Sequence, residues 1–269
     1  MTDPSWRKKY GPWALVTGAS EGIGRQMAEE LARAGLDLVL VARRRAHLDR
    51  LAETLERDHG IAVRVIDLDL SAPDAAPKLL EALAGLDIGL FVASAGFGTS
   101  GRFVDADLAT ELAMLDVNCR AVLSLTHALG RRFVQRGSGG IVLMSSLLAF
   151  QGVPFAAHYA ATKAYVQSLA EGLAHELAPF GVDVVASAPG PIRSGFAAVA
   201  DMRMGMAQQP RVVARATLAA LGRRTTVRPG WLSKLLEASL KLPRAMRVRI
   251  MRRVMGGMTK HKTGLPARQ

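Results

Sequence analysis

The stretch Thr17-Gly18-Ala19-Ser20-Glu21-Gly22-Ile23-Gly24 joins a short apolar run, Trp13–Thr17, to a helical pattern that begins at Ile23. Its three glycines permit a tight turn and leave room for a pyrophosphate against the backbone at the start of a helix. A lone glycine triplet also suits a β-to-α turn that binds nothing. The stretch therefore predicts a strand, a turn and a helix, and the rest of the chain must decide whether a nucleotide binds there.

Apolar runs and helical patterns alternate along the chain, which is typical of βαβ units and a parallel sheet. Strands are predicted at Trp13–Thr17, Leu36–Ala42, Ala62–Asp67, Ile88–Ala93, Gly140–Ser145 and Val182–Ala188. Helices are predicted at Ile23–Ala34, Ala46–Asp58, Asp74–Ala84, Asp107–Arg136 and Tyr159–Ala178. We therefore expect an α/β fold, a single doubly wound parallel sheet of the Rossmann type over residues 1–200, with residues 201–269 as a C-terminal helical extension of the same domain.

Length and charge fit one globular domain with an unusual C-terminal part. The chain has 269 residues, 49% of them hydrophobic, which is enough for a substantial core. The formal charge is +12, but residues 1–201 hold 19 Lys and Arg against 22 Asp and Glu, while residues 202–269 hold 16 against 1. The single cysteine, Cys119, allows no intrachain disulfide and no cysteine-based metal site, and no secretion signal is visible. We expect a cytoplasmic protein without a metal site.

Further motifs follow the glycine turn in a fixed order. They are Asp69-Leu70-Ser71, Ala95-Gly96, Asn118, Ser146, Tyr159-x-x-x-Lys163 and Pro189-Gly190. With the G-x-x-x-G-x-G spacing, they resemble the short-chain dehydrogenase/reductase family over about residues 10–196, in particular its hydroxysteroid dehydrogenase and ketoacyl reductase members. The resemblance implies an oxidoreductase that acts on CH–OH or carbonyl groups with a nicotinamide dinucleotide, and a homodimer or homotetramer.

The resemblance also implies which residues hold the cofactor. They are Gly18, Ser20, Gly22, Ile23, Gly24, Arg43, Arg44, Asp69, Leu70, Ala95, Gly96, Tyr159, Lys163, Pro189, Gly190, Ile192 and Ser194. By resemblance, Asp69 accepts the adenine amino group, Leu70 flanks the ring, and the Ile192 backbone bonds the carboxamide. Ser194 stands where threonine is usual and keeps the hydroxyl. One departure is Ala93-Ser94-Ala95-Gly96 in place of Asn-Asn-Ala-Gly, which puts the bracing of the central strands in doubt.

The end of the second strand favours NADP(H) over NAD(H). An NAD enzyme usually places a carboxylate there for the ribose hydroxyls, whereas this chain has Ala42 followed by Arg43, Arg44 and Arg45. Since a guanidinium makes charge-assisted bonds to phosphate, Arg43 is the expected partner of the 2′-phosphate and Arg44 is the second choice. A solvated basic turn is the alternative interpretation.

The candidate catalytic groups are Asn118, Ser146, Tyr159 and Lys163. Tyr159 and Lys163 share one helix face, so we expect Lys163 to lower the pKa of Tyr159 and Tyr159 to act as general acid or base on the carbonyl oxygen. Ser146 is expected to donate to that oxygen, in preference to Ser145. By resemblance, Lys163 also holds the nicotinamide ribose and Asn118 holds a water in the proton relay. Without the resemblance, Asn118 would be interpreted as a residue that bends its helix.

Two apolar segments favour a hydrophobic or lipid-like carbonyl substrate. Met202, Met204 and Met206 suit an adaptable substrate wall, although core filling explains them equally well. Gly152-Val153-Pro154-Phe155 resembles members that act on hydrophobic ketones. We assign His158, next to Tyr159, no role. The alternative function is a catalytically silent dinucleotide-binding regulatory protein or membrane-surface scaffold.

Residues 231–255 predict two basic amphipathic helices that meet at Pro243. Such helices suit peripheral contact with an anionic membrane, a lid over the substrate, a subunit contact or a solvated charged face. We do not expect nucleic-acid binding, because Trp231 is the only aromatic residue after Phe196. The sequence leaves the four alternatives for the basic helices open.

Overall fold

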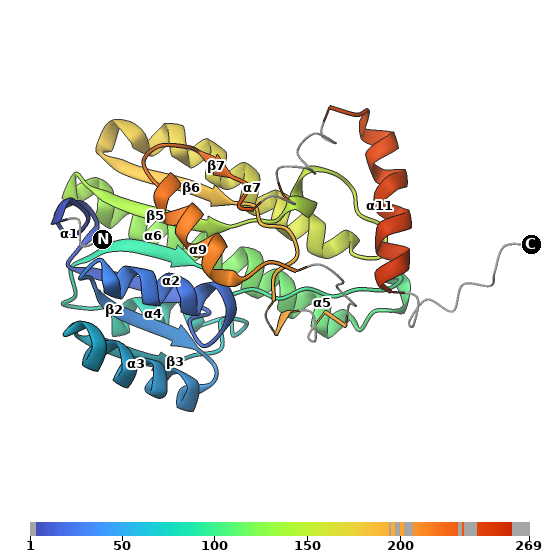
Figure 1. Ribbon diagram of the computed structural model, residues 1–269. Coiled ribbons are helices and arrows are strands. Elements are labelled where there is room, and N and C mark those ends of the chain that lie inside the picture. Colours follow the sequence, from blue (N-terminus) through green and yellow to red (C-terminus); the bar gives the residue numbers. More distant parts are fainter. Residues whose placement is uncertain are drawn as a thin grey trace, which may run out of the picture.

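A parallel β-sheet lies between two layers of helices in the computed structural model of this chain (Figure 1). The structure describes residues 4–193, 195–196, 200–201, 207–230, 233 and 241–259. The strands in this part of the chain are β1 (Trp13–Thr17), β2 (Asp37–Ala42), β3 (Val63–Asp67), β4 (Ile88–Ala93), β5 (Gly139–Met144), β6 (Val182–Ser187) and β7 (Thr226–Val227). They pair in the order β3-β2-β1-β4-β5-β6-β7, and every neighbouring pair is parallel.

The α-helices described are α1 (Pro4–Tyr10), α2 (Gly22–Arg33), α3 (Arg45–His59), α4 (Ala75–Ala82), α5 (Leu108–Leu115), α6 (Ala121–Arg136), α7 (Ala157–Leu177), α9 (Pro210–Ala220) and α11 (Arg244–Met258). Short 3-10 turns are η1 (Phe103–Asp105), η3 (Leu147–Phe150) and η4 (Ala178–Phe180). A π-helical turn, η2 (Asp116–Arg120), connects α5 to α6. The helices on the two faces complete the doubly wound fold.

The predicted α/β fold is confirmed, and most predicted elements lie within two residues of their expected ends. The exception is Asp107–Arg136, which is divided into α5, the π turn η2 and α6. Helices α1 and α9 and strand β7 were not predicted from the sequence. Two of these are short, since α1 has seven residues and β7 has two, so neither carries a recognisable periodic pattern.

Alternation along the strands divides the core between the two faces of the sheet. In β1, Val16 packs with residues of α2, α3 and α9, while Leu15 packs on the other face with residues of α4, α6 and α7. In β2, Leu40 and Val41 divide in the same way. Because both faces are covered, the central strands β4 and β5 are buried throughout, and the sequence shows continuous apolar runs there instead of alternation.

The strand order reverses at β1, which pairs with β2 on one side and with β4 on the other. In open α/β sheets a ligand crevice forms at the carboxyl ends of the strands at such a switch point. Helix α11 stands across this end of the sheet (Figure 1). The second predicted amphipathic helix is thus found, and it begins directly after Pro243. Of the first, which was predicted from residue 231 up to Pro243, only Ser233, Lys241 and Leu242 belong to the described residues.

Among the described residues, no helix is both long enough and apolar enough to cross a membrane.

Candidate active site

The glycine turn between β1 and α2 approaches the loop after β4 too closely for a side chain. Gly18 has φ +68°, and a Cβ there would lie 2.7 Å from the Ala95 backbone nitrogen. On the neighbouring loop, a Cβ on Gly96 would lie 2.9 Å from Asn118 Oδ1 and 3.3 Å from Lys163 Nζ. The missing side chains leave open a backbone-lined floor at the start of α2, which is the cradle that a dinucleotide pyrophosphate requires.

A cavity of about 600 Å³ runs over this floor. The predicted site residues that line it are Gly18, Ser20, Gly22, Ile23, Gly24, Arg43, Arg44, Asp69, Leu70, Ala95, Gly96, Ser146, Tyr159, Lys163, Pro189, Gly190 and Ile192. Asn118 is not among the lining residues and is fully buried beside them. The prediction for Ser194 lies outside the described residues, as do those for Met202, Met204 and Met206.

Thr17 braces the two central strands where the sequence analysis left their bracing in doubt. Its Oγ1 accepts hydrogen bonds from the backbone nitrogens of Ser94 and Ala95, both at 3.2 Å. The same hydroxyl donates to the Val92 carbonyl at 3.3 Å. Three bonds from one β1 side chain thus hold the end of β4, so the small residues in Ala93-Ser94-Ala95-Gly96 do not leave it unsupported.

Arg43 and Arg44 line the cavity where β2 stops, which is the expected adenosine end. Arg44 Nη2 donates to Ser20 Oγ at 3.1 Å and lies 2.9 Å from the Glu21 carboxylate. The Arg43 side chain is 71% exposed, and its Nη1 lies 3.9 Å from Asp69 Oδ2. Partial burial opposes ionisation of Asp69, but hydrogen bonds from Ser71 and the charge of Arg43 outweigh it and lower the pKa of that carboxyl. Two cations therefore face the end of the site at which β2 stops.

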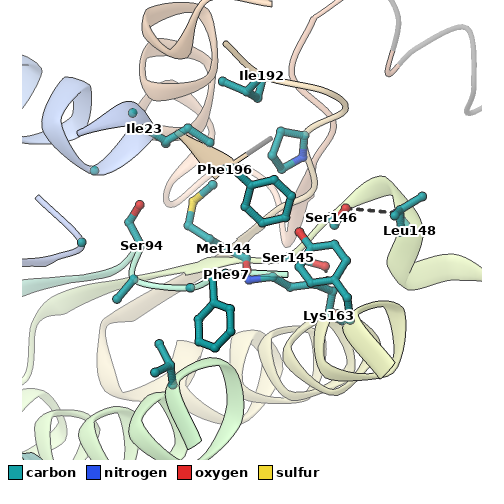
Figure 2. A pocket seen from close by; sticks show the side chains of 18 of the residues that line it. Ile23, Ser94, Phe97, Met144, Ser145, Ser146, Leu148, Lys163, Ile192 and Phe196 are labelled. Carbon is teal, nitrogen blue, oxygen red and sulfur yellow. Dashed lines mark hydrogen bonds between the residues drawn. The ribbon is translucent and has the colours of Figure 1, made fainter. Parts of the chain in front are cut away.

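Lys163 and Tyr159 come from the buried face of α7, and Ser146 follows β5. Figure 2 labels Lys163 and Ser146. Lys163 Nζ donates to the Met144 carbonyl at 2.8 Å, and it lies 5.9 Å from the centre of the Tyr159 ring. Ser146 Oγ accepts from the Leu148 nitrogen at 3.2 Å, while Ser145 donates to the Lys163 carbonyl at 3.2 Å. The Ser145 hydroxyl is thus occupied by a backbone carbonyl. Ser146 is the serine whose hydroxyl interacts with Tyr159.

The predicted lowering of the Tyr159 pKa by Lys163 is wrong. Burial dominates and raises the pKa of Tyr159 to about 12, although a hydrogen bond with Ser146 acts in the opposite direction. Burial also lowers the pKa of Lys163 to about 8. Because burial disfavours both charged forms, the tyrosine holds its proton near neutrality.

Asn118 lies in the π turn η2, and its side chain is fully engaged with the protein. Its Nδ2 donates to the Phe97 carbonyl at 2.9 Å and to Thr162 Oγ1 at 3.0 Å. Its Oδ1 accepts from the Phe97 nitrogen at 3.2 Å. The amide therefore ties the loop after β4 to α7, directly before Lys163. The role of Asn118 in holding a water of the proton relay stays a prediction.

The end of the cavity away from Arg43 and Arg44 is lined by one face of α11, which is apolar except at Arg247. Five apolar side chains of this helix line it, namely Ile250, Met251, Val254, Met255 and Met258. Met255, which is 2% exposed, packs in a cluster with Val153, Ala156 and Ala160, beside the start of α7. Of the alternatives for the basic helices, the position of α11 matches a cover over the cavity.

A family model described as short chain dehydrogenase matches residues 12–203. The chain belongs to this family. As a short-chain dehydrogenase it is an oxidoreductase that acts on CH–OH or carbonyl groups with a nicotinamide dinucleotide, as the motifs predicted. The glycine cradle described above fits such a cofactor.

Several relatives of this short-chain dehydrogenase are named for their substrates. A 7beta-hydroxysteroid dehydrogenase of Clostridium sardiniense is 40% identical over 181 residues, which are 67% of this chain and 69% of the relative. A very-long-chain 3-oxoacyl-CoA reductase-like protein of Arabidopsis thaliana is 33% identical over 239 residues, which are 86% of this chain and 77% of the relative. Each name gives the activity of the relative that carries it.

Solved structures of the family share the fold over most of the chain. A structure on 7beta-hydroxysteroid dehydrogenase stereoselectivity gives a TM-score of 0.84 at 27% identity, and the match covers 91% of this chain and 98% of that one. A short-chain dehydrogenase of Sphingobium yanoikuyae in complex with NADPH gives 0.77 at 31% identity, covering 90% and 95%.

Some residues around the site of this short-chain dehydrogenase escaped the sequence analysis. His158 Nδ1 lies 2.6 Å from the carboxylate of Glu111, which is buried in α5, so the histidine next to Tyr159 connects α5 to α7. Ser233 Oγ accepts from the Gly190 nitrogen at 3.1 Å and holds the loop after β6. These partners are 47 and 43 residues apart, and no local pattern marks them.

Proposed function

We propose that the chain interconverts a hydrophobic ketone or aldehyde and its alcohol with NADP(H), using Tyr159 as general acid or base. One observation carries this proposal: a single cavity joins the glycine cradle, the group of Ser146, Tyr159 and Lys163, and the apolar face of α11. A carbonyl compound between that group and α11 would lie next to a bound nicotinamide. The substrate must then be largely apolar.

Four polar side chains at or beside the centre of the cavity, those of Tyr159, Ser146, Lys163 and Asn118, have a part in the proposed reduction. When bound, the cofactor supplies a hydride to the carbonyl carbon. The Tyr159 hydroxyl gives its proton to the carbonyl oxygen, and the Ser146 hydroxyl donates a hydrogen bond that stabilises the developing negative charge. Lys163, fixed by the Met144 carbonyl, holds the nicotinamide ribose, and Asn118 fixes the loop that faces it.

Support for NADP(H) over NAD(H) comes from the charge at the adenosine end. Arg43 and Arg44 lie where β2 stops, and no carboxylate takes the place of Ala42. Arg43 is exposed, so its guanidinium is accessible to a 2′-phosphate, while Arg44 is held by Ser20 and Glu21. Arg43 is therefore the phosphate partner in this proposal.

The proposal extends to assembly and location. We infer a homodimer or homotetramer in the cytoplasm, which also touches anionic membrane surfaces through the outer face of α11. Its exposed arginines, Arg249, Arg252 and Arg253, lie outside the cavity lining. Cationic side chains on a helix surface attract anionic headgroups.

A carbonyl screen that follows NADPH absorbance tests the proposed reaction. Its panel contains aliphatic, steroid and ketoacyl carbonyl compounds, each also measured with NADH. We expect oxidation of NADPH with at least one apolar carbonyl compound and slower oxidation of NADH. No oxidation with any member of the panel would favour the alternative of a catalytically silent dinucleotide-binding protein.

A further inference from the structure

The face of α11 that lines the cavity is apolar except at one end, where it carries a cation. Arg247 stands one turn before Ile250 and Met251, and it is the arginine of α11 among the described lining residues. Positions 247, 250, 251, 254, 255 and 258 follow the helical period, so they form one stripe along the cavity. Over this stripe the helix rises by about 16 Å.

The guanidinium of Arg247 is only partly satisfied by the protein. Its Nη1 donates to the Phe150 carbonyl at 3.0 Å, at the end of η3. Its Nε is buried and has no hydrogen-bond partner among the residues that the structure describes. Since buried donors are nearly always paired, a ligand atom that accepts a hydrogen bond at Nε is favoured there.

A second cation adds positive charge at the same turn. The Arg228 guanidinium lies over the Phe150 ring, with its carbon 4.5 Å from the ring centre. Arg228 and Arg247 thus approach Phe150 from its ring and from its carbonyl.

No described carboxylate lines this end of the cavity. The acidic lining residues among those described are Glu21 and Asp69, both at the adenosine end. Glu21 pairs with Arg44 at 2.9 Å, and Asp69 faces Arg43 at 3.9 Å. The positive charge of Arg247 is therefore not neutralised from within the described lining of the cavity.

We propose that Arg247 binds a carboxylate carried at the far end of an apolar carbonyl substrate, so that the substrate class is a hydrophobic keto acid. The inference rests on the proposed function and names the group that the substrate presents to α11. A guanidinium and a carboxylate form paired, charge-assisted hydrogen bonds, and these are stronger in an apolar cavity than in water. The reacting carbonyl would lie at Tyr159 and the carboxylate at Arg247.

Turnover of a matched pair of compounds tests the proposal. The pair is 12-oxooctadecanoate and its methyl ester. A third compound, 3-oxohexadecanoyl-CoA, tests whether Arg247 binds the phosphates of coenzyme A instead of a carboxylate. For Arg247→Gln we expect kcat/KM for the keto acid to fall by roughly tenfold to a hundredfold, because a charged hydrogen bond is lost. The ester should change by less than threefold, Arg247→Lys should keep most activity on the acid, and Arg252→Gln, on the outer face of α11, should match wild type.

Three results would overturn the proposal. A parallel loss for acid and ester would mean that Arg247 only attaches α11 to the Phe150 turn, and an unchanged acid rate would leave it without a role in binding. A selective loss for the coenzyme A thioester alone would reassign Arg247 to phosphate.

Binding without turnover separates this inference from the proposed function. We expect hexadecanoate to raise the Tm of wild-type protein more than hexadecanol does, and Arg247→Gln to abolish that difference. If no ketone is reduced but this difference is found, the proposed reaction fails and the carboxylate site stands. Equal shifts with both ligands in wild type would remove the carboxylate site even if ketones are reduced.

Discussion

Tyr159 and Lys163 show how burial and charge compete at the scale of single residues. The sequence places them four residues apart, and the spacing alone suggests that the cation lowers the pKa of the phenol. In the structure Lys163 Nζ donates to the Met144 carbonyl, and burial raises the pKa of Tyr159 to about 12. The motif was thus predictable, but the electrostatic outcome was not, because burial depends on tertiary packing.

The pKa of Lys163 makes stability depend on pH with a defined sign. Burial lowers this pKa from its ordinary 10.5 to about 8, so between these pH values the folded state binds fewer protons than the unfolded state. The free energy of unfolding should therefore rise with pH, by up to about 1.4 kcal/mol per pH unit.

Lys163→Met removes this contribution. Between pH 8 and pH 10, we expect the free energy of unfolding of wild type to rise by about 2 kcal/mol relative to that of Lys163→Met. Urea unfolding of both proteins at the two pH values measures it. A constant difference would show that Lys163 titrates as an exposed lysine does.

Arg43 is the residue on which the cofactor preference depends. Arg43→Asp replaces the exposed cation at the end of β2 by an anion that repels a 2′-phosphate and suits ribose hydroxyls. We expect the ratio of kcat/KM for NADPH to that for NADH to fall by roughly a hundredfold, since charged hydrogen bonds to phosphate are lost. Arg57→Asp, an exposed change on α3, serves as the control. An unchanged ratio in Arg43→Asp would transfer the role to Arg44.

At the scale of elements, the local patterns were predictable and the long-range contacts were not. Asn118 interrupts the predicted helix Asp107–Arg136 as a π turn, and such turns are frequent at functional sites. The Glu111–His158 contact between α5 and α7 has no sequence signal, because neither residue type at that separation implies contact. Likewise, the amphipathic pattern predicted α11, but only the fold shows that its apolar face lies over the cavity.

Met255 connects α11 to the start of α7. It is 2% exposed in a cluster with Val153, Ala156 and Ala160. Met255→Ala should destabilise the protein by about 2 kcal/mol or more, as buried Met-to-Ala changes do. It should also raise KM for an apolar ketone several-fold while the Kd for NADPH stays unchanged. Met246→Ala on the same helix, outside the described cavity lining, is the control, and equal effects of the two changes would contradict the covering role of α11.

At the scale of the molecule, the charge of +12 is concentrated in the last quarter of the chain. The counts in the sequence predicted this division but left the purpose of the basic part open. The structure shows that α11 uses one face for the cavity and leaves Arg249, Arg252 and Arg253 exposed on another. One helix thus serves a site and presents a cationic surface.

Changing these three arginines to glutamate tests membrane contact. We expect wild type to sediment with phosphatidylserine vesicles at low salt, and the triple variant to stay in the supernatant, because about 1 kcal/mol of attraction per cation is lost. NADPH binding should be equal in both proteins. Equal recovery of both in the supernatant would remove membrane contact from the proposal.

The most direct test of the whole account is Tyr159→Phe, measured for both NADPH binding and turnover of an apolar ketone from the screen. The ring keeps its packing against Phe196, at 5.3 Å between ring centres, and loses only the hydroxyl that gives the proton. We expect the Kd for NADPH to stay within about threefold and kcat to fall at least a hundredfold, the scale of a lost general acid. A kcat close to wild type, with NADPH still bound, would contradict the proposed mechanism.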